Sequence, residues 1–273
     1  NYALYSNTTA NNNMAFGYNA LGLNLTGANN VAMGRDALLN NTTGFDNTAV
    51  GYIALCANTT GACNVAIGRD SLDSNTTGSS NVAVGTDTLQ ANTTGGSNIA
   101  IGDDALKGNS TASFNIGIGA TALQNNQTGT GNVAVGHQSL PSNTADNNTA
   151  VGYQSLLANT TGASNVALGA FSLDENTTGA DNVAIGTYAL TRVTTACYNT
   201  AVGTAAAQSI TTGANNVAVG YLALEANTTG TQNTAVGTNA LAANTTGAQN
   251  VAIGQSALGA NTTCGNLTAV GYG

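Results

Sequence analysis

The stretch NTAVGYQSLLANTTGAS, residues 148–164, is one seventeen-residue repeat, and close copies of it occupy the whole chain. A Gly ends the Val-rich half of each copy. The spacing between these glycines is seventeen residues, except for one step of sixteen between Gly136 and Gly152. Self-similarity at a fixed period is the signature of a repeat architecture. The sixteen glycines are Gly17, Gly34, Gly51, Gly68, Gly85, Gly102, Gly119, Gly136, Gly152, Gly169, Gly186, Gly203, Gly220, Gly237, Gly254 and Gly271.

Each repeat contains a strand pattern and a turn pattern. In NVAIG, at residues 64–68, bulky and small side chains alternate with the period of two that is typical of a strand. NTTG is a turn, because Asn and Thr side chains bond their own backbone and Gly tolerates positive φ. A Gly and an NTTG in every repeat leave no room for a ten-residue helix. A Leu between the two patterns supplies a further core residue.

These patterns predict an all-β fold, a parallel β-solenoid (β-helix or β-roll) of sixteen coils of seventeen residues. Each coil has one strand-rich side and one Asn-Thr-Thr-Gly turn. Seventeen residues cannot bury a face alone, so the coils must stack to share a core. We expect residues 1–273 to form a single continuous repeat domain. Both hands of coil accommodate this period, and the strand pattern leaves open whether its Ala-Gly face packs inside the coil or against another chain.

Composition excludes several classes of function. The net charge is -8, with four Lys and Arg residues, whereas nucleic-acid binding needs clustered basic side chains. No run of eighteen apolar residues exists, so we expect no membrane insertion. The only His, His137, has no partner at ligand spacing, and Asp103-Asp104 supplies too few oxygens for calcium. We therefore expect no enzyme activity, no cofactor and no metal.

An Asn stands four residues before the Gly of nearly every repeat, and Leu267 is the one exception. Stacked side-chain amides can bond one another and the backbone of neighbouring coils. We expect a structural Asn ladder, with an array that binds a ligand as the alternative. The predicted ladder comprises Asn30, Asn47, Asn64, Asn81, Asn98, Asn115, Asn132, Asn148, Asn165, Asn182, Asn199, Asn216, Asn233 and Asn250.

The Asn of the turn matches the N-glycosylation acceptor pattern, because a Thr follows two residues later with no Pro between. Turns on a solenoid are expected to project outward, so glycans would coat it; the alternative is that Asn and Thr are simply good turn formers. The candidate acceptors are Asn7, Asn24, Asn41, Asn58, Asn75, Asn92, Asn109, Asn126, Asn159, Asn176, Asn227, Asn244 and Asn261.

Two further features bear on function. Regular Thr rows on a flat solenoid can bind ice, but adjacent residues such as Thr59 and Thr60 point to opposite faces of an extended segment, so only one of them can join a row. Cys56 and Cys63 flank one turn and are a candidate disulfide, which would fit an oxidising environment. Cys197 and Cys264 lie four repeats apart, so they are free or link different chains.

The motifs NTAVGYQSLLANTTG (148–162), NVAIGTYAL (182–190) and NTAVGTNALAANTTG (233–247) resemble repeats of bacterial and phage tail-fibre proteins and of trimeric autotransporter adhesin heads. The resemblance covers the whole chain and centres on N-x-A-[VI]-G. It implies a left-handed parallel β-roll assembled as a homotrimer, and extracellular structure or attachment. The repeat of those heads is shorter than seventeen residues.

These observations predict a structural extracellular fibre, at the cell or virion surface, whose partner is another copy of the chain in a head-to-tail filament or a homotrimer. Two alternatives remain: a trimeric adhesin or tail-fibre head that binds host or cell-surface glycans, and an ice-binding solenoid. The chain opens with NYALYSNTTA, which has no initiator Met and no signal peptide. Since no capping element is visible, we expect a segment of a longer repeat protein or a subunit that stacks end to end.

Overall fold

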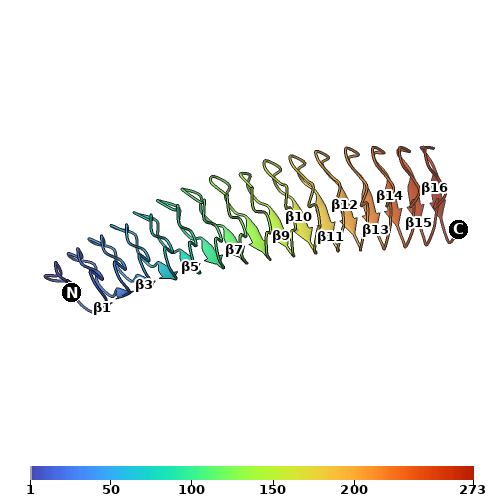
Figure 1. Cartoon of the computed structure of the whole chain (residues 1–273). Coiled ribbons are helices and arrows are strands. Elements are labelled where there is room, and N and C mark those ends of the chain that lie inside the picture. Colours follow the sequence, from blue (N-terminus) through green and yellow to red (C-terminus); the bar gives the residue numbers. More distant parts are fainter. Residues whose placement is uncertain (1) are drawn as a thin grey trace. The chain divides into compact units, whose positions relative to one another are not determined.

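The computed structural model describes residues 2–273, which contain sixteen strands of three residues each and no helix (Figure 1). Every strand is the bulky-Ala-bulky part of one repeat, with a Gly in place of Ala in β7. The strands are β1 (Met14–Phe16), β2 (Val31–Met33), β3 (Thr48–Val50), β4 (Val65–Ile67), β5 (Val82–Val84), β6 (Ile99–Ile101), β7 (Ile116–Ile118), β8 (Val133–Val135), β9 (Thr149–Val151), β10 (Val166–Leu168), β11 (Val183–Ile185), β12 (Thr200–Val202), β13 (Val217–Val219), β14 (Thr234–Val236), β15 (Val251–Ile253) and β16 (Thr268–Val270).

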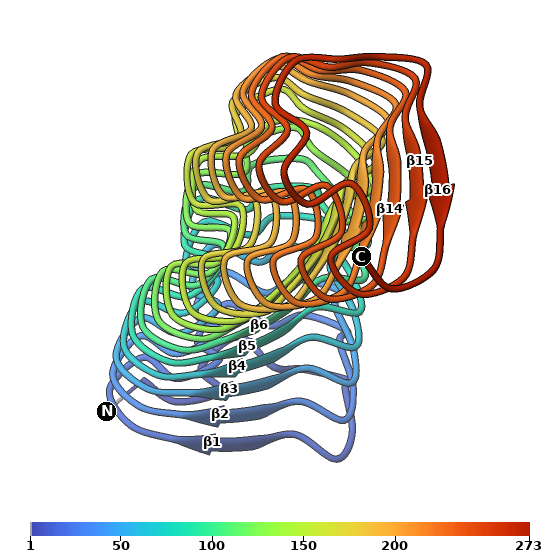
Figure 2. The same cartoon turned by 90° about the vertical axis from the view of Figure 1, so that its right-hand side faces the viewer.

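The chain divides into two compact units, Asn1–His137 with β1–β8 and Gln138–Gly273 with β9–β16. Within each unit, neighbouring strands pair in parallel and in chain order, with each Ala opposite the equivalent residue of the next coil, as for Ala49 and Ala66. Figure 2 shows β1–β6 stacked in this way in the first unit and β14–β16 in the second. The predicted parallel β-solenoid with a seventeen-residue coil is therefore confirmed. A single continuous domain over residues 1–273 stays a prediction.

The strands place their small residue inside the coil and their bulky residues outside. Ala66 is fully buried, whereas Val65 and Ile67 on either side of it are partly exposed. The reason is visible at Gly117, where an added Cβ would lie 3.3 Å from both Cγ and Cδ1 of Leu106. The strand backbone thus packs almost directly on the Leu of the preceding coil, and no side chain larger than that of Ala fits between them.

The segment that carries the Leu is a series of tight turns instead of a second sheet. Leu38 has a φ of 52° and Asp36 a φ of 56°, in the left-handed region that non-glycine residues seldom adopt. With this backbone conformation, Asp36 N donates a hydrogen bond to Tyr18 O of the preceding coil (2.9 Å). Leu38 N donates one to Ala54 O of the following coil (2.9 Å). Each left-handed residue costs about 1 kcal/mol of conformational free energy. Complete burial of the Leu38 side chain contributes about 2 kcal/mol to stability, which offsets this cost.

Candidate functional site

The Asn that precedes each strand joins three successive coils. Asn64 Oδ1 accepts hydrogen bonds from the backbone N (3.0 Å) and from Nδ2 (3.2 Å) of Asn81, and Asn64 Nδ2 donates to Gly78 O (2.9 Å) and to Asn47 Oδ1 (3.1 Å). All fourteen residues of the predicted ladder are buried in this column. At Leu267, which replaces the Asn, the backbone N still donates to Asn250 Oδ1 (3.0 Å).

The Asn of the turn forms a second buried column. Asn58 Nδ2 donates to Asn41 Oδ1 of the preceding coil (2.8 Å) and to Gly61 O of its own turn (3.0 Å). Gly61 O also accepts from Asn47 Nδ2 (2.9 Å), so one turn carbonyl joins both columns. This column was not predicted from the sequence, although an Asn stands at this turn position in most repeats. Its pattern is equally typical of an exposed turn, and only burial distinguishes the two.

The prediction that the turns present their acceptor asparagines to solvent is wrong for eleven of the thirteen residues. A glycan requires an accessible Nδ2, whereas both hydrogens of an amide such as that of Asn58 are engaged inside the coil. Asn7 and Asn261, in the outermost turns, are partly exposed. The fully buried acceptors are Asn24, Asn41, Asn58, Asn75, Asn92, Asn109, Asn126, Asn159, Asn176, Asn227 and Asn244.

The turn column is interrupted in the second unit, where Val193 and Ile210 take the Asn position. Asn176 Oδ1 consequently lies buried without a hydrogen-bond partner, because the following coil offers no amide at Val193. In the coil of Ile210 the core Leu is replaced by Ala207, and both residues are buried. A larger side chain at one position thus accompanies a smaller one three residues away, which keeps the core volume nearly constant.

Restoring the consensus at these positions is expected to stabilise the chain. The triple variant Val193→Asn, Ala207→Leu, Ile210→Asn gives Asn176 Oδ1 a donor and completes the column, which is worth about 1–3 kcal/mol. Val193→Asn alone is the control: it only moves the unpaired acceptor one coil along and should bring no gain. Urea unfolding followed by circular dichroism measures both variants, and a triple variant less stable than the wild type would contradict the prediction.

In most turns that contain two threonines, the two have different environments. Thr59 is partly buried, and its Oγ1 donates to Thr76 O of the next coil (3.0 Å). Thr60 is exposed. Only the second Thr of the pair therefore forms an outward row, and the hydroxyl of the first is used to hold the coils together.

The predicted disulfide is absent, because Cys56 and Cys63 are both free thiols. The turn between them places Asn58 inside the coil. Cys63 is exposed, whereas Cys56 lies partly buried. Burial, together with the carboxylates of Asp36 and Asp73, raises the pKa of the Cys56 thiol, which lowers its reactivity toward a disulfide partner. Cys197 and Cys264 are free thiols as well.

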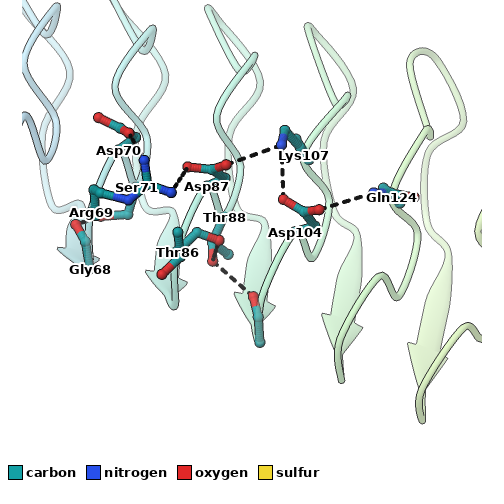
Figure 3. Close-up of polar contacts among 11 residues, drawn as sticks. Gly68, Arg69, Asp70, Ser71, Thr86, Asp87, Thr88, Asp104, Lys107 and Gln124 are labelled. Carbon is teal, nitrogen blue, oxygen red and sulfur yellow. Dashed lines mark hydrogen bonds and ion pairs between the residues drawn. The ribbon is translucent and has the colours of Figure 1, made fainter.

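Five charged side chains of the first unit, with Gln124, form a track along one edge of four successive coils (Figure 3). Asp87 lies between Arg69 (3.4 Å) and Lys107 (3.1 Å), and Asp104 lies between Lys107 (2.9 Å) and the amide of Gln124 (3.3 Å). The hydrogen bonds that Lys107 Nζ donates to Asp104 and Asp87 raise the pKa of Lys107. Such solvent-exposed pairs each contribute little to stability.

Asp174 is the most perturbed carboxyl group. Its Oδ1 is buried without a hydrogen-bond partner, and its pKa rises to about 6, first because of burial and second because of the charge of Glu175. An aspartate in an unfolded chain has a pKa of about 3.9. The folded state therefore binds more protons than the unfolded state between about pH 4 and pH 6, and stability falls as pH rises through this window.

Asp174→Asn is expected to remove this pH dependence. Relative to the wild type, the variant should gain about 1 kcal/mol between pH 4 and pH 7, a value reduced from the full shift because the side chain is partly solvated. Thermal melts at pH 4, 5, 6 and 7 measure the difference. Asp181→Asn, at an exposed position, is the matched control and should show no such trend. A difference between Asp174→Asn and the wild type that stays constant with pH would show that Asp174 does not titrate in this range.

Residues 2–273 show neither a cluster of three or more His, Cys, Asp or Glu side chains able to hold a metal ion nor a helix long and apolar enough to cross a membrane. A shallow depression of about 230 Å³ lies beside Tyr2, Tyr5 and Leu23 in the first unit. No protein-family model, no curated protein and no solved structure matches the chain. The strongest candidates for function are thus the surfaces that the stacked coils create.

Proposed function

We propose that this chain is a structural protein of an extracellular fibre. The observation that carries the proposal is that each coil is completed by its neighbours within a unit: Asn81, for example, receives its partners from the coil of Asn64 and from the coil of Asn98. A coil contributes only one Leu and a few Ala residues to the apolar core, so stacking supplies most of its stability. Material built in this way suits a load-bearing shaft.

The same chemistry allows the stack to continue from one chain to the next. Within each unit the strands pair in parallel and in register, so each coil presents to the next the same row of backbone groups and Asn amides. A sheet edge with such a row recruits further strands. A second chain in the same register offers matching donors and acceptors, including Asn amides at the same spacing. End-to-end addition would therefore extend the fibre without any new type of contact.

Electron microscopy of native material tests this proposal. We expect continuous filaments with an axial repeat of about 4.8 Å between coils. Isolated particles at all concentrations, with no such filaments, would contradict it. Short three-fold rods would instead favour a trimeric adhesin head.

Attachment to a surface is the second candidate, and exposed aromatic rings in the second unit favour it. Tyr153 and Phe171 meet edge to face with centroids 5.3 Å apart, and Phe171 stacks on Tyr188 at 5.2 Å. Both tyrosines are exposed, and ring faces of this kind can stack on the apolar faces of sugars. Binding to a glycan array that is lost in Tyr188→Ala would support attachment. We do not propose ice binding, because in most turns only one Thr of the pair is exposed.

A further inference from the structure

The outer face of the strands is apolar and uncovered in both units. Two side chains of each strand point outward, and these 32 positions carry no charge; five are Thr and the others are Val, Ile, Leu, Met or Phe. We call these outward positions of β1–β16 the sheet face. Many of its large side chains are more than a third exposed, including Phe16, Met33, Ile67, Ile99, Ile101, Ile118, Ile185, Val217 and Ile253.

An uncovered face of this composition is unusual for a soluble chain. Single exposed apolar residues are common, whereas contiguous apolar patches of more than a few hundred Å² mark interaction sites. Parallel sheets in particular are almost always covered on both sides, and their strands then read as continuous apolar runs. The run Val65–Ile67 fits that description, although only Ala66 is covered by this chain. The sheet face therefore requires an occupant.

The geometry points to a second copy of this chain as that occupant. We propose that the sheet face packs on the sheet face of a second copy, forming a two-fold pair of face-to-face sheets; this rests on the proposed role as a structural fibre. Both faces are uncharged, so no ionic group loses its hydration. Identical side chains repeat at every strand, about 4.8 Å apart, and a second sheet with the same spacing can interdigitate along its whole length.

The area within one unit is that of a small interface. A three-residue strand is about 10 Å long and strands lie about 4.8 Å apart, so the eight strands of one unit cover roughly 400 Å². Pairing of one unit with its counterpart therefore covers roughly 800 Å² counted over both copies, near the low end of protein interfaces, and every further coil in register adds to it. Because an isologous pair is closed, this contact gives two copies and not an open series.

Light scattering and sedimentation velocity test the pairing. We expect the wild type to have twice the 26.8 kDa mass of the chain. Ile101→Lys with Ile185→Lys places one charge on the sheet face of each unit and should raise the dissociation constant at least about 100-fold. The control is Thr94→Lys with Thr178→Lys, which adds the same charge at exposed turn residues of the same two coils and should leave the pair intact.

A second, milder variant keeps the test valid if the lysine variant fails to fold. Ile99→Thr with Val183→Thr introduces a residue that the same column already holds at Thr48 and Thr149, and it should weaken pairing about 10-fold. Circular dichroism verifies that every variant is folded. A wild type of one-chain or three-chain mass, pairing that survives both substitutions, or a control that dissociates equally would overturn the proposal.

The two proposals fail in different ways. If the fibre proposal fails, the protein remains a closed pair with no filaments. If face-to-face pairing fails, electron microscopy shows filaments whose width is the same for the wild type and for Ile101→Lys with Ile185→Lys. If both hold, the lysine variant gives filaments of half the wild-type cross-section.

Discussion

Gly102→Ala is expected to destabilise the first unit by about 4 kcal/mol. Gly102 has a φ of +127°, where an L side chain is strained, and its added Cβ would lie 2.7 Å from both C and O of Gly119 in the next coil. Those atoms belong to the backbone, so relief requires the coils to separate and their ladder bonds to lengthen. All sixteen glycines of this column share a φ between 127° and 142°.

The matched control is Gly96, in the turn that precedes the strand of Gly102. Gly96 does not have a positive φ, its added Cβ would lie 3.0 Å from Ser79 O, and its column already contains Ala62. Gly96→Ala should therefore cost less than about 1 kcal/mol. Urea unfolding gives the overall difference, and hydrogen exchange of peptides around residues 99–120 locates it. Equal costs at the two glycines would show that the positive φ of Gly102 is not the decisive feature.

Asn81→Leu is expected to cost about 3–5 kcal/mol. Leu is close to Asn in size, so the substitution removes hydrogen bonds without opening a large cavity. It takes away the acceptor of Asn98 N (3.0 Å) and the donor to Gly95 O (2.9 Å), and the backbone N of Asn98 is left buried and unpaired. Each lost pair contributes about 1 kcal/mol, and an unsatisfied buried group adds its desolvation penalty.

Asn125→Leu is the control for this substitution, because Asn125 is exposed. It should change stability by less than about 0.5 kcal/mol. Hydrogen exchange supplies a local readout: in Asn81→Leu the amide of Asn98 should exchange much faster than in the wild type. Unchanged protection of that amide would mean that another acceptor replaces Asn81 Oδ1.

The period and the parallel pairing could be predicted because they follow from residue types that recur at equal spacing. Asn64, Ala66 and Ile67 recur with equivalents in nearly every repeat, and only stacking in register places equivalents side by side. The sequence did not predict which side chains of each strand point into the coil and which point outward. Val-Ala-Ile has an apolar side chain on both faces, so alternation alone does not tell which one is covered.

The position of the turn in each repeat was predicted correctly, but the side chain of its Asn was wrongly expected to point into solvent. Asn58 and Thr60 are both typical turn formers, yet the first is fully buried and the second is exposed. Acceptor motifs and turn propensity depend on neighbours in the chain, whereas burial of Asn58 depends on Asn41 and Asn47 of the preceding coil. The missing disulfide has the same origin, because the inward course of the turn cannot be read from the spacing of Cys56 and Cys63.

The amino-acid sequence by itself determined the coil length, the all-β class and the stacking in register, because a short repeat with one Leu must share its core with its neighbours. Only the tertiary structure decided which side of each strand is inside, that two amide columns and not one run through each unit, and that the bulky residues of β1–β16 form an uncovered face. These features depend on the distance between each strand and the Leu of the preceding coil. That distance admits Ala and excludes anything larger, as the position of Gly117 beside Leu106 shows.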